Sequence, residues 1–272
     1  MKRSCILTFP SDVRRFRGVE LDTKAYLDRI DYQGSLMPTA ETFRRLQVAH
    51  LLAVPFENLS IHAHQPIVLE DEALFTKIVQ QRRGGFCYET NGLFAALLRD
   101  LGFSVTMLSA QVSQAEGFGP DFDHMALMVD LEQRWLVDVG FGDSFREPLR
   151  IDQRDEQRQG GRTYQILSDP PYFVLMQQRA SEEWQAQYRF TLQPYEYVNY
   201  AEMCRYHQTS PNSHFTKARI CSRATETGRI TLDKTRLITT AEGARQEKIL
   251  TNPTEYAELL RQHFGIVMTN ER

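Results

Sequence analysis

The spacing of apolar residues changes abruptly at Gly102, and this change limits the folds that the chain can adopt. Before Gly102 the apolar residues recur at helical spacing, as Leu93, Leu97 and Leu101 do. After it, the segment 103–107 alternates between apolar and polar residues, which is typical of a strand. A chain whose helices come first and whose strands follow indicates an α+β fold rather than a regular alternation of strand and helix.

The first hundred residues predict three helices. The helix expected over 39–53 starts after Pro38, the one over 71–81 has Asp71 as its cap, and the one over 87–101 ends at Gly102. His50 lies on the apolar face of the first and is interpreted as a core histidine.

The rest of the chain predicts mainly strands, with a mixed tail. Strands are expected over 103–107, 124–129, 134–139, 164–167, 172–176, 184–192, 218–222 and 229–239. Two more helices are expected over 195–206 and 253–264, and the charged stretch 152–162 is interpreted as a surface loop.

Composition excludes several classes of protein. The 272 residues are 42% hydrophobic and 25% charged with a formal net charge of -3, and no basic block points to a nucleic-acid partner. No apolar run reaches the roughly 18–20 residues of a membrane span, and the apolar stretch within 1–10 is too short for a signal peptide. The four cysteines are far apart, so we expect reduced thiols and a cytoplasmic protein. The wide gaps between Cys204, His207, His214 and Cys221 fit no common metal site, and no metal is expected.

The segment Arg83-Gly84-Gly85-Phe86-Cys87 places a cysteine where a glycine turn meets the start of a helix. Two glycines permit a sharp turn and a close approach to the backbone. Unpaired N–H groups and the helix dipole at this point favour thiolate, so a lowered pKa and a nucleophilic role are one interpretation of Cys87. The other is a small buried cysteine, which most free cysteines are.

His124 and Asp138 are candidate partners of that cysteine. They lie in consecutive predicted strands, and they share a face only if the connecting loop has the right parity, as a three-residue loop over 132–134 would give. The sequence leaves this parity open. Taken singly, His124 is better explained as a polar residue at a strand edge and Asp138 as a turn-capping carboxylate. Together, however, they match the order nucleophile, base and orienting acid.

Five blocks of sequence together resemble the arylamine N-acetyltransferase family. They are Val54-Pro55-Phe56-Glu57-Asn58-Leu59-Ser60-Ile61-His62, Arg83-Gly84-Gly85-Phe86-Cys87, the His124 strand, Trp135-Leu136-Val137-Asp138-Val139-Gly140-Phe141-Gly142 and Thr209-Ser210-Pro211-Asn212-Ser213-His214-Phe215. The similarity spans nearly the whole chain. The residues after Gly142 depart into a part of the family that varies, which leaves the acceptor preference open.

The resemblance implies an α+β fold with three parts. These are a helical domain over 1–86, a catalytic helix with an antiparallel β-barrel-like domain over 87–193, and an α/β lid over 194–272. It further implies a Cys87–His124–Asp138 triad of the cysteine-protease type, a structural pair between Glu57 and Arg83, and acetyl-coenzyme A as the acetyl donor.

Residues that contact the substrates are expected around this triad. An arylamine is neutral at pH 7, so an aromatic lining suffices, and Phe141 and Phe86 are the candidates for it. The resemblance places Phe215 against the adenine ring of coenzyme A and assigns Gly140 and Gly142 to the same ligand.

The function predicted from these features is acetyl transfer through a Cys87 thioester to arylamines, arylhydrazines or N-hydroxyarylamines. A cysteine hydrolase or a transglutaminase-like enzyme uses the same order of residues and is the first alternative. A non-catalytic protein that binds coenzyme A or a partner protein is the second.

Overall fold

The computed structural model describes residues 21–179 and 182–268. The described part of the first hundred residues holds the helices α1 (Thr23–Arg29), α2 (Ala40–Ala53), α3 (Leu59–His62), α4 (Asp71–Phe75), the π-helix η1 (Thr76–Gln80) and α5 (Cys87–Asp100). It also contains a short strand, β1 (Phe56–Glu57), which the sequence did not predict. Later helices are α6 (Tyr197–Thr209), α7 (His214–Lys217) and α8 (Pro253–Phe264). Two predictions concern residues outside the described ones. They are the interpretation of 1–10 as too short for a signal peptide and the prediction that Cys5 is a reduced thiol.

Antiparallel pairing builds two sheets. The larger has the order β6-β5-β4-β2-β10-β9-β8-β7 with β3 paired to β2, and the smaller has the order β1-β11-β12-β13-β14. The strands of the larger sheet are β2 (Ser104–Gln114), β3 (Gly117–Phe118), β4 (His124–Asp130), β5 (Arg134–Val137), β6 (Leu149–Arg150), β7 (Gln157–Gln159), β8 (Arg162–Asp169), β9 (Tyr172–Arg179) and β10 (Gln185–Phe190). Those of the smaller are β1 (Phe56–Glu57), β11 (Ile220–Thr225), β12 (Gly228–Asp233), β13 (Arg236–Ala241) and β14 (Ala244–Ile249).

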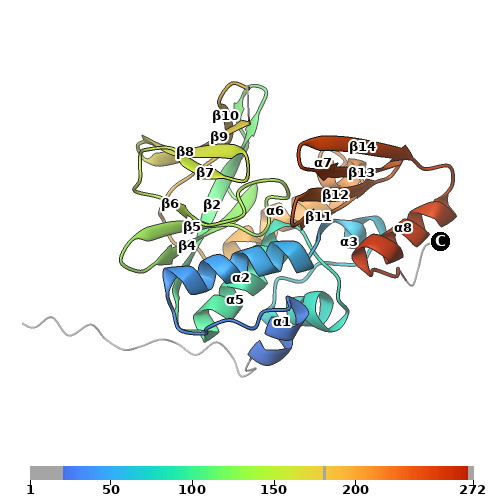
Figure 1. Cartoon of the computed structure of the whole chain (residues 1–272), viewed down its shortest axis with the longest axis horizontal. Coiled ribbons are helices and arrows are strands. Elements are labelled where there is room, and N and C mark those ends of the chain that lie inside the picture. Colours follow the sequence, from blue (N-terminus) through green and yellow to red (C-terminus); the bar gives the residue numbers. More distant parts are fainter. Residues whose placement is uncertain (1–20, 180–181, 269–272) are drawn as a thin grey trace, which may run out of the picture.

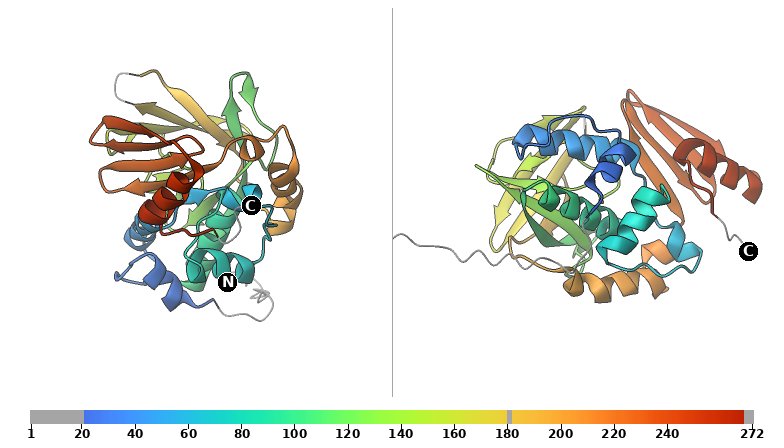
Figure 2. Two further views of the ribbon diagram at one scale, coloured as in Figure 1. Left: turned by 90° about the vertical axis from the view of Figure 1, so that its right-hand side faces the viewer. Right: turned by 90° about the horizontal axis from the view of Figure 1, so that it is seen from below.

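The larger sheet curls into a nearly closed barrel. Its end strands β6 and β7 are joined through one side chain, because Gln157 bonds both the N–H and the C=O of Arg150, at 2.8 and 3.0 Å. The barrel and the C-terminal sheet lie beside each other above the helices α1, α2 and α5 in Figure 1, whereas α8 packs on the outer side of the C-terminal sheet (Figures 1 and 2). The predicted α+β class is confirmed.

Three apolar cores hold these layers together. One lies between the helices and the barrel strands β2 and β4, the second fills the barrel, and the third lies beneath α8 on β11 and β12. Helix α5 is almost wholly buried in the first, which explains its run of leucine and phenylalanine residues. It ends as predicted, with Gly102 in the left-handed region at φ 89°.

The structure corrects several predicted elements. Asp71 is the first residue of α4 rather than its cap, and the helix expected over 71–81 continues beyond Phe75 as the π-helix η1. The loop expected over 152–162 contains β7, and the strand expected over 229–239 is a hairpin, β12 and β13, followed by β14. Helix α1 was missed, because its seven residues carry too little periodicity to predict it.

The glycine turn before Cys87 lies against the backbone of Pro55. A Cβ added at Gly84 would lie 1.8 Å from the Pro55 carbonyl oxygen, to which Gly85 N–H also donates at 3.3 Å. The turn is thereby joined to β1, where the N–H of Glu57 donates to the Gly85 carbonyl at 3.0 Å. Only glycine allows this contact.

We therefore expect Gly84→Ala to lower the free energy of unfolding by more than about 2 kcal/mol, because the new methyl group overlaps backbone that cannot move aside. The measurement is thermal or urea unfolding followed by circular dichroism. Gly102→Asn is the control, since nothing lies within 4 Å of a Cβ there and asparagine tolerates a positive φ. Equal losses from the two substitutions would contradict the proposed contact.

Candidate active site

The structure brings Cys87, His124 and Asp138 together at the junction of the helices and the barrel. Each has only 3% of its surface exposed. Cys87 begins α5, His124 begins β4, and Asp138 directly follows β5. The N–H of Met125, the residue after His124, donates to the Cys87 sulfur. His124 Nε2 lies 2.7 Å from Asp138 Oδ2, so the contact with Asp138 uses Nε2 and not Nδ1.

Strand register explains why His124 and Asp138 meet. Leu127 pairs with Val137 and Asp130 with Arg134, so residues with even numbers on β4 face those with even numbers on the following strand. The parity that the sequence left open is therefore the one that puts both side chains on one face. The connecting loop has three residues, 131–133, and therefore begins one residue earlier than the three-residue loop over 132–134 that the sequence suggested.

The Asp138 carboxylate accepts hydrogen bonds from four groups. Besides His124, the donors are Asn91 Nδ2 at 2.8 Å, the Gly140 N–H at 2.8 Å and the Tyr188 hydroxyl at 3.1 Å. Burial by itself raises the pKa of Asp138, but His124 and the bonds from Asn91 and Gly140 bring this pKa below its ordinary value of 3.8. Asp138 is therefore a carboxylate at neutral pH despite its burial.

Asn91 and Tyr188 were not predicted from the sequence. Asn91 lies one helical turn after Cys87, a spacing that places both on one face of α5 and is a signal that the sequence contains. Its amide also bonds Met125 O at 2.6 Å and Val139 N–H at 2.8 Å. Tyr188 comes from β10, far along the chain, and nothing in its local sequence marks it.

The Cys87 thiol differs from the sequence prediction. Burial raises the pKa of Cys87 well above its ordinary value, and the Asp138 charge adds to this, while the Met125 N–H acts in the opposite direction. The predicted lowering of this pKa is wrong, because the sulfur is enclosed and loses more hydration than the helix end returns. A thiolate here requires a base close by to take the proton.

A buried group of charges lies beneath the glycine turn. Arg83 Nη2 contacts Glu57 Oε1 at 2.8 Å, which is the pair that the resemblance implied, and Lys77 contacts Glu89 Oε1 at 2.6 Å. Glu89 Oε2 also accepts from the Phe86 N–H at 3.2 Å. Two carboxylates and two cations give a neutral group, so its burial is tolerated and the start of α5 is anchored.

The residues predicted to contact the substrates lie in two places. Gly140, Phe141 and Gly142 are in the loop after Asp138, and Phe86 and Phe215 pack against each other. Phe141 stacks edge-on to His124 at 5.1 Å between ring centroids. Gly140 packs so tightly on α5 that an added Cβ would lie 2.7 Å from the Cys87 Cα atom, and Gly142 has φ 89°. Phe86 is fully buried, and its ring lies 5.4 Å from that of Phe215. Their ligand roles stay predictions.

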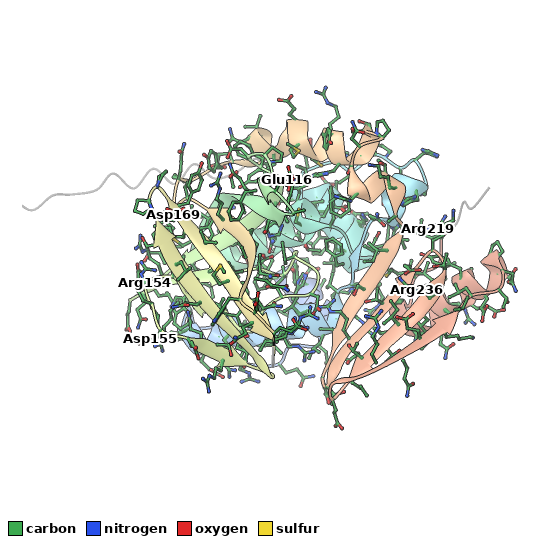
Figure 3. All side chains as sticks on the ribbon, turned by 90° about the horizontal axis from the view of Figure 1, so that it is seen from above. Glu116, Arg154, Asp155, Asp169, Arg219 and Arg236 are labelled. Carbon is green, nitrogen blue, oxygen red and sulfur yellow. The ribbon has the colours of Figure 1, made fainter. Side chains whose placement is uncertain are left out.

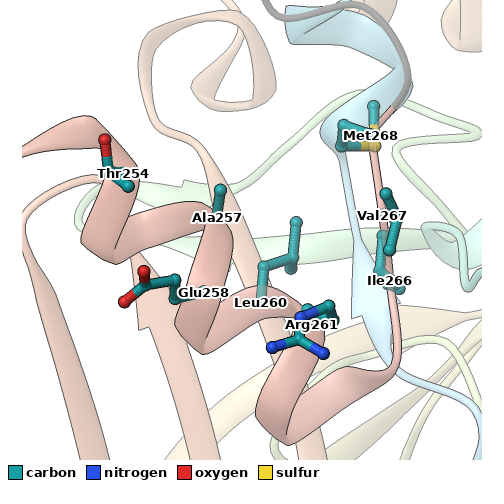
Figure 4. A pocket seen from close by; sticks show the side chains of 8 residues that line it. All are labelled: Thr254, Ala257, Glu258, Leu260, Arg261, Ile266, Val267 and Met268. Carbon is teal, nitrogen blue, oxygen red and sulfur yellow. The ribbon is translucent and has the colours of Figure 1, made fainter.

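Other features of the described residues do not enlarge this site. A concavity of about 460 Å³ lies between α8 and the segment 266–268 (Figure 4), and none of the three triad candidates lines it. Within residues 21–179 and 182–268 no three histidine, cysteine or acidic side chains are grouped to hold a metal ion. In the same ranges no helix is long and apolar enough to cross a membrane.

Three other residues that the sequence singled out are buried as well. Cys204 and Cys221 are free and buried, and His50 is a core residue whose Nδ1 lies 2.8 Å from the Tyr26 hydroxyl.

Comparison with known proteins identifies the family. Residues 39–272 match a family model described as N-acetyltransferase. The chain is 33% identical to the arylamine N-acetyltransferase / N-hydroxyarylamine O-acetyltransferase of Salmonella typhimurium, over 89% of this chain and 88% of that protein. This chain belongs to the arylamine N-acetyltransferase family. Members of this family are acyltransferases, and the fold and recognition predictions are confirmed.

Two further relatives show the range of the family. The structure of Mycobacterium marinum arylamine N-acetyltransferase in complex with CoA superposes with a TM-score of 0.84 at 32% identity, covering 90% of this chain and 93% of the other. A proansamycin X synthase from Amycolatopsis mediterranei is 31% identical over 88% of this chain and 95% of its own length. Relatives at similar identity thus carry different names, so the acceptor must be found by experiment.

The four-donor arrangement around Asp138 predicts the effect of Tyr188→Phe. This substitution keeps the ring and removes one donor, so the free energy of unfolding falls by about 1–2 kcal/mol at pH 7. Because the folded pKa of Asp138 lies below 3.8, this loss is complete above about pH 5 and shrinks as the pH falls through 3.8 and then through the folded value. Urea unfolding between pH 3 and 8 measures it.

Tyr206→Phe is the matched control for that experiment, since Tyr206 is 39% exposed. It should leave stability within about 0.5 kcal/mol of the wild type. A Tyr188→Phe protein as stable as this control at pH 7 would show that the hydroxyl contributes nothing to Asp138.

Proposed function

We propose that this protein transfers an acetyl group from acetyl-coenzyme A to arylamines, arylhydrazines or N-hydroxyarylamines through a thioester on Cys87. The observation that carries the proposal is the 2.7 Å contact between His124 and Asp138 beside a cysteine at a helix start, in a chain of the arylamine N-acetyltransferase family. Family membership favours this reaction over the hydrolase and the transglutaminase-like alternatives. The cytoplasmic location stays a prediction from the sequence.

The first half-reaction starts with a proton transfer. His124 takes the Cys87 proton, and the imidazolium beside the sulfur makes the thiolate possible in a buried site. The thiolate attacks the acetyl carbonyl, and backbone N–H groups at the start of α5 stabilise the oxyanion. Coenzyme A leaves as a thiol after receiving the proton from His124, so one thioester replaces another at nearly equal free energy.

In the second half-reaction an arylamine attacks the carbonyl carbon of the Cys87 thioester, and His124 takes the proton of the amine. The bond between the Cys87 sulfur and the acetyl carbon then breaks, so the sulfur leaves as a thiolate beside the imidazolium and the acetylated amine is released. Asp138 holds the imidazole in one orientation and stabilises its charge. Phe141, edge-on to His124, offers an apolar face to the aromatic ring of the acceptor. Two half-reactions that share one nucleophile predict ping-pong kinetics.

Intact mass spectrometry tests the covalent step. Protein mixed with acetyl-coenzyme A should gain one acetyl group on Cys87, and an arylamine should remove it while acetylarylamine appears. Cys87→Ser should gain none, whereas Cys204→Ser, which alters another buried thiol, should behave as the wild type. Loss of the acetyl group to water at the same rate with and without amine would support the hydrolase instead.

A second experiment tests the role of Asp138. Asp138→Asn is expected to lower the rate of acetyl transfer at least about a hundredfold, because the imidazole loses its orientation and its counter-charge. The control is Asp152→Asn, since Asp152 pairs with Arg134 at the surface. Circular dichroism establishes that both variants fold, and wild-type turnover from Asp138→Asn would remove Asp138 from the mechanism.

A further inference from the structure

Three arginines contact a single carboxylate, Asp143, in the loop that follows Asp138, and a fourth arginine lies close to them. Arg162 Nη2 contacts both oxygens of Asp143 at 2.9 Å, Arg179 Nη2 contacts Oδ2 at 3.2 Å, and Arg229 Nε contacts Oδ1 at 3.1 Å. The fourth, Arg146, donates to the carbonyl oxygens of Glu226 and Gly228 in the turn between β11 and β12. We call these four arginines the arginine cluster.

The charge of the cluster is not balanced. Four guanidinium groups and the carboxylate of Asp143 give a net charge of 4 − 1 = +3. Among the described residues, Asp143 is the one carboxylate that forms ion pairs with Arg162, Arg179 and Arg229. Burial, together with the charge of Arg162, lowers the pKa of Arg146, and burial with the charges of Arg162 and Arg146 lowers that of Arg229. The arginines therefore repel one another, a cost that a bound anion would offset.

Support of Asp143 alone does not account for the excess of positive charge in the arginine cluster. One bidentate arginine satisfies both oxygens of Asp143, and Arg162 already does so. Arg179 adds a single contact, and its side chain is 48% exposed. Its guanidinium thus retains donors that can reach a ligand from solvent.

The cluster lies close to the reacting sulfur. Asp143 follows Gly140 by three residues, at most roughly 10 Å of chain, and Gly140 packs directly on Cys87. Arg162 and Arg179 come from the barrel and Arg229 from the C-terminal sheet. Figure 3 shows these two sheets converging at the lower edge of that view. Arg146, in the loop between β5 and β6, donates to the Gly228 carbonyl at the start of β12.

We propose that the arginine cluster binds a phosphate group of the coenzyme A donor. This inference rests on the proposed function. Guanidinium groups match phosphate oxygens in pairs and hold them more tightly than neutral donors do. The pantetheine arm has about 13 bonds between sulfur and the first phosphorus, which is roughly 15 Å when extended at the spacing of a polypeptide chain. A phosphate on arginines that extend outward from Asp143 is within that reach when the thioester lies at Cys87.

Kinetics with two donors test the proposal. Acetyl-coenzyme A carries phosphates and S-acetylpantetheine carries none, and each is assayed with a neutral arylamine. Arg179→Gln and Arg162→Gln should each lower kcat/KM for acetyl-coenzyme A about tenfold and leave kcat/KM for S-acetylpantetheine unchanged. Arg158→Gln is the matched control, since Arg158 lies on the neighbouring strand β7 and pairs only with Glu156 at the surface in the described structure. It should affect neither donor.

Two outcomes would overturn the proposal. An equal fall with both donors would show that the arginines act by supporting the loop. A fall confined to an acidic acceptor such as 4-aminobenzoate would assign the site to a carboxylate of the acceptor. Arg179 is exposed and makes one contact with Asp143, so its replacement should not disturb the fold. Arg179→Gln therefore distinguishes these outcomes even if Arg162→Gln fails to fold.

Calorimetry separates this inference from the proposed function. Coenzyme A and pantetheine are titrated into the wild type and the two arginine variants without any acceptor. Weaker binding of coenzyme A alone by the variants supports the cluster even if Cys87 is never acetylated. Unchanged coenzyme A binding in a protein whose Cys87 is acetylated normally refutes the cluster and leaves the proposed function intact.

Discussion

The carboxylate of Asp138 is the constraint on which the candidate site depends. A buried charge is costly unless several donors surround it, and here His124, Asn91, Tyr188 and the Gly140 N–H do so. These donors come from β4, α5, β10 and the loop after β5. The barrel must therefore close and pack on α5 before the charge is satisfied, so formation of the site and assembly of the two layers are coupled.

The loop that begins at Asp138 is held by carboxylates at two points. Asp138 fixes its start against α5, and Asp143 fixes its middle through arginines of the barrel and the C-terminal sheet. Gly140 and Phe141 lie between these points, one on Cys87 and the other on His124. In the proposed function the loop is thus one wall of the acyl site, and its two anchors connect that site to α5, the barrel and the C-terminal sheet.

The sequence predicted what depends on local pattern. The start of α5 at Cys87, its end at Gly102 and the strands of His124 and Trp135 all follow from spacing that short-range geometry enforces. Whether His124 and Asp138 lie on the same face of the sheet depends on the register of β4 with the next strand. The local sequence pattern allowed two registers, and only one of them puts both side chains on one face. Family resemblance supplied the triad before the register was known.

What the sequence could not predict comes from distant pairing. Tyr188 reaches Asp138 only because β10 pairs with β2, and no property of its own segment indicates this. Three members of the arginine cluster, Arg162, Arg179 and Arg229, lie on three strands that the chain brings together at one point. The raised pKa of Cys87 is of the same kind, because burial is set by the packing of the whole molecule and not by the helix end.

That burial has a chemical consequence for the choice between transfer and hydrolysis. A thiol whose pKa is raised by burial stays protonated until His124 takes its proton, so reactivity depends on the imidazole rather than on the sulfur alone. The same enclosure that removes water from the sulfur also removes it from a thioester formed there. In the proposed mechanism, an acceptor that brings its own apolar ring against Phe141 gains free energy by entering such a site, and water does not. In the proposed function, enclosure of the cysteine therefore favours an arylamine over water as the acceptor.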